Sequence, residues 1–159
     1  MTVTTRPARP ADVPEILRLI VALATYEHEP DAVMSTEDSL RATLFGDRPI
    51  VYATMLEVDG IARGLALWFL TFSTWTGKPS LYLEDLFVEP ETRGTGAGRA
   101  LLAALAREAK ARDCARMDWA VLDWNEDAIR FYRAIGAARV DGWQPWRISG
   151  EALDRLAAS

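Results

Sequence analysis

The chain has 159 residues and a formal net charge of −5, and half of its residues are hydrophobic, six of them tryptophan. This composition excludes a disordered chain and favours a single domain, residues 1–159, around one core. The acidic balance does not favour nucleic-acid binding, and no apolar run reaches the roughly 18 residues of a membrane span. One cysteine and one histidine exclude a zinc site and an internal disulfide, so we expect no metal cofactor and a cytoplasmic location.

The spacing of apolar residues predicts a mixed α/β domain of order β-α-α-β-β-β-α-β-α-β with a short terminal helix. The predicted strands are 3–6, 50–58, 61–71, 81–88, 116–122 and 140–148, the last interrupted by Pro145. The predicted helices are 13–23, which Asp12 would cap, 35–44, 97–111 and 125–134, with a terminal helix after Ser149. Asp59-Gly60 between two apolar runs predicts a β-hairpin, and Ser73–Ser80 reads as a loop.

The most informative stretch is the glycine-rich segment Arg93–Gly98, between an apolar strand and an amphipathic helix. Unpaired N–H groups at a helix start and glycines without Cβ atoms form a cradle for a phosphate-bearing cofactor. A P-loop is excluded because Arg99-Ala100 follows Gly98, and a dinucleotide fingerprint is excluded because Arg99 occupies the third glycine position. A plain glycine-rich turn that caps a helix is the alternative.

Two acidic positions are candidates for chemistry on an amine. Glu84-Asp85 interrupts an apolar strand, and because strand neighbours point to opposite faces, only one acid faces a given cleft. A carboxylate there would accept a proton from an ammonium group, whose pKa is about 10. Tyr26 and Glu27 combine an aromatic ring with a charge that attracts cations. The alternatives are an arginine-paired acid, a solvated loop at residues 26–31, and for Trp75 either a substrate wall or a packing residue.

Asn125 and Tyr132 lie seven residues apart, so they share one face of the predicted helix 125–134. A tyrosine hydroxyl there would protonate a departing thiolate. The alternatives are that Tyr132 belongs to the core and that Asn125 is only an N-cap.

Arg93-x-x-Gly96-x-Gly98 resembles the pyrophosphate signature of the GCN5-related N-acetyltransferase (GNAT) superfamily. Leu81–Val88, Trp124–Glu126, Phe131-Tyr132 and Gly136-Ala137 extend the resemblance to its diamine (spermidine/spermine) acetyltransferase branch. The resemblance implies an α/β GNAT fold, in which helices flank a mixed, mostly antiparallel central sheet. It also implies direct transfer from acetyl-CoA to an amine in a ternary complex, and a homodimer.

The resemblance implies a role for each matching position. Tyr132 would be the general acid toward the CoA thiolate, and Glu84 would take the amine proton. Residues implied to bind substrate are Tyr26, Glu27, Trp75 and Glu84. Residues implied to bind acetyl-CoA are Leu86, Phe87, Val88, Arg93, Gly94, Thr95, Gly96, Ala97, Gly98, Arg99, Asn125 and Ala128.

Two departures bear on the acceptor. The polyamine enzymes carry acids where this chain has Ser73 and Gln144, so two partners for a distant ammonium are missing. We therefore expect acetylation of a small primary amine, which is a diamine, a polyamine or a thialysine-like amino acid, with no nucleic-acid or membrane partner. The alternatives are a protein or peptide acceptor and a non-catalytic acyl-CoA-binding protein.

Overall fold

The computed structural model describes residues 1–159 and divides into two compact units, Met1–Ala120 and Val121–Ser159. The organisation as a single domain stays a prediction. The first unit contains the whole β-sheet and three α-helices, and the second contains two short helices.

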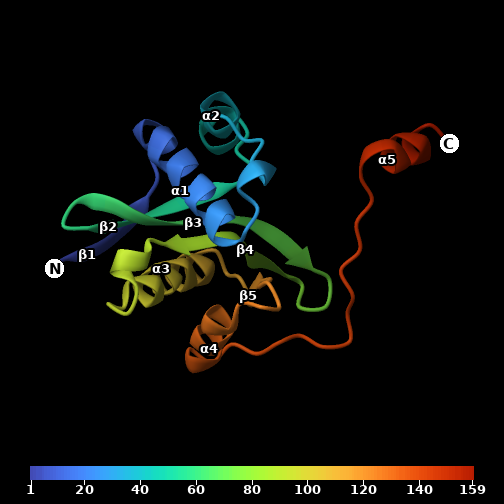
Figure 1. The fold of residues 1–159 in the computed structure, drawn as a ribbon. Coiled ribbons are helices and arrows are strands. Elements are labelled where there is room, and N and C mark those ends of the chain that lie inside the picture. Colours follow the sequence, from blue (N-terminus) through green and yellow to red (C-terminus); the bar gives the residue numbers. More distant parts are fainter. The chain divides into compact units, whose positions relative to one another are not determined.

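The first unit is built on a five-stranded sheet of order β1-β2-β3-β4-β5 (Figure 1). Neighbouring strands are antiparallel from β1 to β4, whereas β5 runs parallel to β4. The strands are β1 (Val3–Pro7), β2 (Tyr52–Val58), β3 (Ile61–Ser73), β4 (Lys78–Val88) and β5 (Met117–Trp119). This sheet confirms the expected mixed, mostly antiparallel α/β fold.

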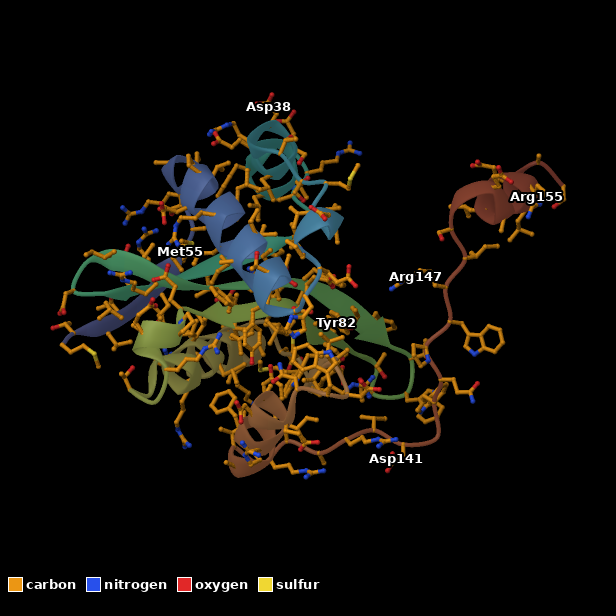
Figure 2. The ribbon with its side chains drawn as sticks, viewed as in Figure 1. Asp38, Met55, Tyr82, Asp141, Arg147 and Arg155 are labelled. Carbon is orange, nitrogen blue, oxygen red and sulfur yellow. The ribbon has the colours of Figure 1, made fainter.

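The helices of the first unit cover both faces of the sheet (Figure 1). These helices are α1 (Val13–Tyr26), α2 (Glu37–Phe45) and α3 (Ala97–Ala111). One core layer joins α1 and α2 to the face that carries Met55, Leu65 and Phe87, and Met55, labelled in Figure 2, is fully buried there. The opposite face packs against α3, whose Leu101 and Leu105 are fully buried.

Most predicted elements are present, with local differences. The Asp59-Gly60 hairpin is confirmed. The predicted loop 73–80 is shorter, because β3 extends to Ser73 and β4 begins at Lys78. Asp12 does not cap α1 with its side chain, because its carboxylate accepts two hydrogen bonds from Arg6 in β1.

The second unit contains α4 (Glu126–Ala134) and α5 (Gly150–Ala157). The predicted strand 140–148 is wrong, since the segment has no regular secondary structure and forms no ladder. Pro145 lacks an N–H donor, and residues 121–159 contain no strand with which the segment could pair. No helix in either unit combines the length and the apolar character that a membrane crossing requires.

Candidate functional site

The glycine-rich loop presents an uninterrupted run of backbone donors. Gly94 and Gly96 have φ values of 76° and 88°, and α3 starts at the next residue without a side-chain cap. None of the six N–H groups from Gly94 to Arg99 donates a hydrogen bond within the protein. Such donors at the positive end of a helix dipole form an anion site. A Cβ atom at either glycine would contact no protein atom, so the space beside the loop is open.

Side chains next to the glycines fix the loop to the end of β4. The Thr95 hydroxyl donates to the Thr92 carbonyl at 2.6 Å, and Arg93 Nε donates to the Val88 carbonyl at 3.1 Å. The Arg93 guanidinium also lies over the Tyr26 ring, 4.5 Å from its centroid. A cation over an aromatic face is attracted to it, so the loop contacts the last residue of α1.

The second half of β4 has a free backbone edge within the first unit. β5 pairs only with Leu81–Leu83, and β4 continues through Glu84–Val88 with β3 alone as its neighbour. A β-bulge interrupts the register, because Trp68 pairs with Leu83 and Leu67 pairs with Asp85. Unpaired N–H and C=O groups on a strand edge can bind an extended ligand as an added strand would be bound.

The bulge separates the two acids of β4. Glu84 has no register partner and is exposed, whereas Asp85 shares the face of Leu67 and is partly buried. Burial, together with the charges of Glu84 and Glu27, raises the pKa of Asp85 to about 6. Burial also raises the pKa of Glu27. The three carboxylates therefore form an acidic cluster at the C-terminal end of α1, with no grouping of side chains suited to a metal ion.

Asp85 is the acid that sequence reasoning left out of the candidate site. The pair Glu84-Asp85 stands out in the sequence as two acids within an apolar strand. The side to which each acid points depends on the bulge, which the sequence does not reveal. Among the other candidates, Trp75 lies exposed in the turn between β3 and β4. Ser73 is buried, and its hydroxyl accepts from the Thr76 N–H at 3.3 Å within that turn.

The remaining candidates belong to the second unit. The Asn125 side chain accepts a hydrogen bond from the Ala128 N–H at 3.2 Å and so caps α4, which leaves open whether it also binds the cofactor. Tyr132 lies in the last turn of α4, and its ring is 5.5 Å from that of Phe131. Gln144 lines an open surface hollow together with Trp143 and Trp146. The catalytic and cofactor roles of Asn125, Ala128 and Tyr132 stay predictions.

Comparisons with known proteins agree with the glycine loop and the sheet. Residues 15–137 match the acetyltransferase (GNAT) family. The chain is 36% identical to thialysine N-epsilon-acetyltransferase of Sus scrofa, over 98% of each chain. It is also 36% identical to the human spermidine/spermine N(1)-acetyltransferase-like protein 1, over 96% of this chain and 23% of that protein. Among solved structures, an integron cassette protein of V. cholerae matches with a TM-score of 0.83 and 26% identity, over 100% of this chain and 99% of the other.

The chain therefore belongs to the GNAT family of acetyltransferases, whose members use acetyl-CoA, and it is an N-acetyltransferase. This confirms the resemblance that the motifs indicated.

Proposed function

We propose that the protein transfers the acetyl group of acetyl-CoA directly to a small primary amine. The observation that carries the proposal is the run of six unbonded N–H groups from Gly94 to Arg99 beside the free edge of β4. A pyrophosphate requires several convergent donors, and a pantetheine arm requires a strand edge, so the two features together suit CoA better than a simple phosphate.

Two segments of the first unit would bind different parts of the cofactor. The N–H groups of Gly94–Arg99 would hold the pyrophosphate, and the backbone of Leu86–Val88 would hydrogen-bond the pantetheine arm. The resemblance to the family adds Asn125 and Ala128 as further cofactor contacts. When bound, acetyl-CoA supplies an activated thioester that an amine nitrogen can attack, with a thiolate as the leaving group.

Two side chains, Glu84 and Tyr132, would carry out the proton transfers. Glu84 is exposed at the bulge, where it would accept the proton of the incoming ammonium, because only the free amine is nucleophilic. Tyr132 would donate its phenolic proton to the leaving sulfur. Asp85 is partly buried, and its negative charge, which interacts with those of Glu84 and Glu27, favours a cation nearby.

The acidic cluster of Glu27, Glu84 and Asp85 supports an amine as the acceptor, because three carboxylates at one end of α1 attract an ammonium group. Tyr26 and Trp75 would contribute aromatic surface. The Ser73 hydroxyl is engaged in its turn and carries no charge for a second ammonium, and Gln144 is neutral. These two positions favour a substrate with one reacting amine, such as a thialysine-like amino acid or a short diamine, over a long polycation.

The test is a CoA-release screen over diamines, polyamines, ω-amino amino acids and peptides with free lysines or N-termini. We expect kcat/KM to be highest for a small ω-amine and lower for spermine. Preference for a peptide would replace the proposed acceptor with a protein. Binding of CoA without turnover of any amine would favour a non-catalytic acyl-CoA-binding protein.

We also propose a homodimer in the cytoplasm, on the resemblance to the diamine branch and on the single cysteine. Sedimentation of the purified chain tests the homodimer, and a mass equal to one chain at working concentration would contradict it.

A further inference from the structure

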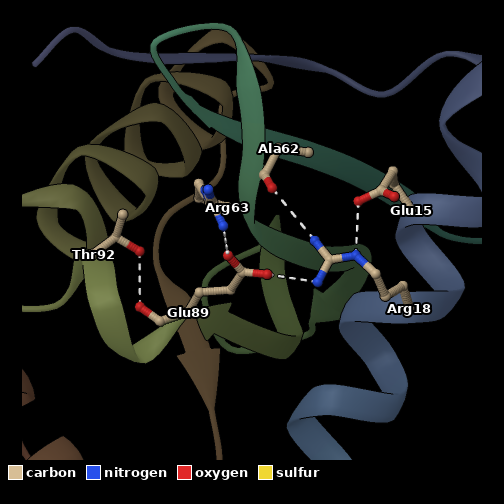
Figure 3. Close-up of polar contacts among 6 residues, drawn as sticks. All are labelled: Glu15, Arg18, Ala62, Arg63, Glu89 and Thr92. Carbon is tan, nitrogen blue, oxygen red and sulfur yellow. Dashed lines mark hydrogen bonds and ion pairs between the residues drawn. The ribbon is translucent and has the colours of Figure 1, made fainter.

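Glu89 is a buried carboxylate for which the proposed reaction has no use. It follows the last residue of β4 and is only 8% exposed. Its two oxygens accept from two arginines, Oε1 from Arg18 Nη1 at 2.5 Å and Oε2 from Arg63 Nη1 at 2.8 Å (Figure 3). Although burial opposes it, hydrogen bonds from Arg63 and Arg18 hold the pKa of Glu89 below its ordinary value.

The two arginines come from different layers of the fold. Arg18 belongs to α1, where it also pairs with Glu15 at 2.9 Å and donates to the Ala62 carbonyl at 3.4 Å. Arg63 belongs to β3, and its carbonyl accepts from the Glu89 N–H at 2.9 Å. Glu89 therefore joins the end of β4 to both α1 and β3 at a single point (Figure 3).

Hydrogen bonds continue from this point into the glycine-rich loop. The Glu89 carbonyl accepts from the Thr92 N–H at 2.9 Å and from the Thr92 hydroxyl at 2.8 Å. The Thr92 carbonyl accepts in turn from the Thr95 hydroxyl, which lies between Gly94 and Gly96. The Glu89 side chain thus bonds to Arg18 and Arg63, and its main-chain carbonyl begins the hydrogen bonds that lead to the loop.

We propose that Glu89, held by Arg18 and Arg63, is a positioning residue for the pyrophosphate loop. The proposal rests on the proposed function, because it assigns the loop to CoA. Donors that are fixed before binding bind more tightly than donors that must be ordered by the ligand. The ion pairs cost desolvation, yet they fix one geometry at the point where the loop begins.

The test compares CoA binding by wild type and Glu89→Gln, measured by titration calorimetry, with steady-state kinetics alongside. Glutamine keeps the shape of glutamate but leaves Arg18 and Arg63 without a charged partner. We expect CoA to bind about 10-fold more weakly, with the KM for acetyl-CoA raised by the same factor. We expect kcat and the KM for the amine to stay within about twofold, because Glu89 touches neither reacting group.

Glu57→Gln is the matched control. Glu57 is a half-buried carboxylate of β2 that pairs with Arg6 at 2.7 Å, outside the loop. We expect it to lower the melting temperature without changing CoA affinity. Wild-type affinity in Glu89→Gln, or an equal loss of affinity in Glu57→Gln, would overturn the proposal.

Two variants of Arg63 test the same proposal if Glu89→Gln does not fold. Arg63→Gln should weaken CoA binding, and Arg63→Lys, which keeps a donor and a charge, should restore most of it. Equal affinity of the two variants would count against the proposal. Because calorimetry measures CoA affinity separately from turnover, a wild type that binds CoA but acetylates no amine would overturn the proposed function and leave this proposal standing.

Discussion

The guanidinium carbon of Arg93 lies 4.5 Å from the centroid of the Tyr26 ring, so the cofactor loop stacks on the last residue of α1. The same guanidinium donates through Nε to the Val88 carbonyl at the end of β4. One side chain thus contacts the predicted pantetheine edge, the predicted pyrophosphate loop and a predicted substrate residue. This arrangement couples the geometry of the cofactor site to that of the acidic cluster.

Removal of the Tyr26 ring should weaken the binding of acetyl-CoA. We expect Tyr26→Leu to raise the KM for acetyl-CoA by about two- to fivefold, the worth of an exposed cation–π contact. Tyr26→Phe keeps the aromatic face, so its KM for acetyl-CoA should remain close to that of wild type. Steady-state kinetics at saturating amine measure both. Equal effects of leucine and phenylalanine would mean that the stacking does not hold Arg93.

Asp85 should make stability depend on pH. Its pKa in the native state is raised to about 6, so the native state binds the proton more tightly than the unfolded chain does. Protonated Asp85 therefore favours folding at low pH, and this contribution to the free energy of unfolding is lost as pH rises from about 4 through 6. Asn has no charge to bury, so we expect Asp85→Asn to raise the free energy of unfolding at pH 8 by about 1–3 kcal/mol, but to change it little at pH 4. Urea denaturation at both pH values measures the difference.

The same substitution should weaken the attraction for the amine and raise its KM. Asp113→Asn is the control, because Asp113 is an exposed carboxylate that pairs with Lys78 outside the acidic cluster. Because Lys78 lowers the pKa of Asp113, the opposite direction to Asp85, Asp113→Asn should not raise the free energy of unfolding at pH 8, and it should leave the KM for the amine unchanged. An Asp85→Asn variant whose stability follows the wild-type pH curve would show that Asp85 titrates normally.

Gly96 should be required for anion binding rather than for packing. Its φ is 88°, and an added Cβ would meet no protein atom, so Gly96→Ala strains the backbone and intrudes only into the space beside the loop donors. We expect about 1–2 kcal/mol of destabilisation from the left-handed conformation and a clear loss of CoA affinity. Gly60→Ala is a matched control, since Gly60 has a φ of 80° and equally open surroundings in the β2–β3 turn. It should be destabilised similarly yet bind CoA normally.

Sequence reasoning succeeded where short-range chemistry decides the structure. The Asp59-Gly60 hairpin and the start of α3 at Ala97 depend on residues adjacent in the chain, and both were predicted. The glycine loop was identified for the same reason, because its donors are consecutive residues. The Asn125 N-cap likewise needs only Ala128, three residues away.

Sequence reasoning failed where the partner is distant. Glu89 reads as the end of a strand, yet its arginines lie 71 and 26 residues away in the chain. Asp12 looks like a helix cap until Arg6 of β1 takes its carboxylate. The apolar pattern of 140–148 is typical of a strand, but a strand needs a neighbour, and none is present in the second unit. The sequence pattern indicates a propensity for strand, but a strand forms only where another strand pairs with it.

Tyr132 carries the most direct test of the chemistry. If its hydroxyl protonates the leaving thiolate, Tyr132→Phe should lower kcat by about 10²-fold while the KM for acetyl-CoA changes little, because the ring remains and only the proton is lost. The control is Tyr82→Phe, which removes a hydroxyl from a half-buried tyrosine of the sheet whose ring is tilted against that of Phe69, with the ring centroids 5.1 Å apart. That variant should keep its kcat. Full turnover by Tyr132→Phe on the best amine of the screen would remove Tyr132 from the mechanism and leave the thiolate to be protonated by water.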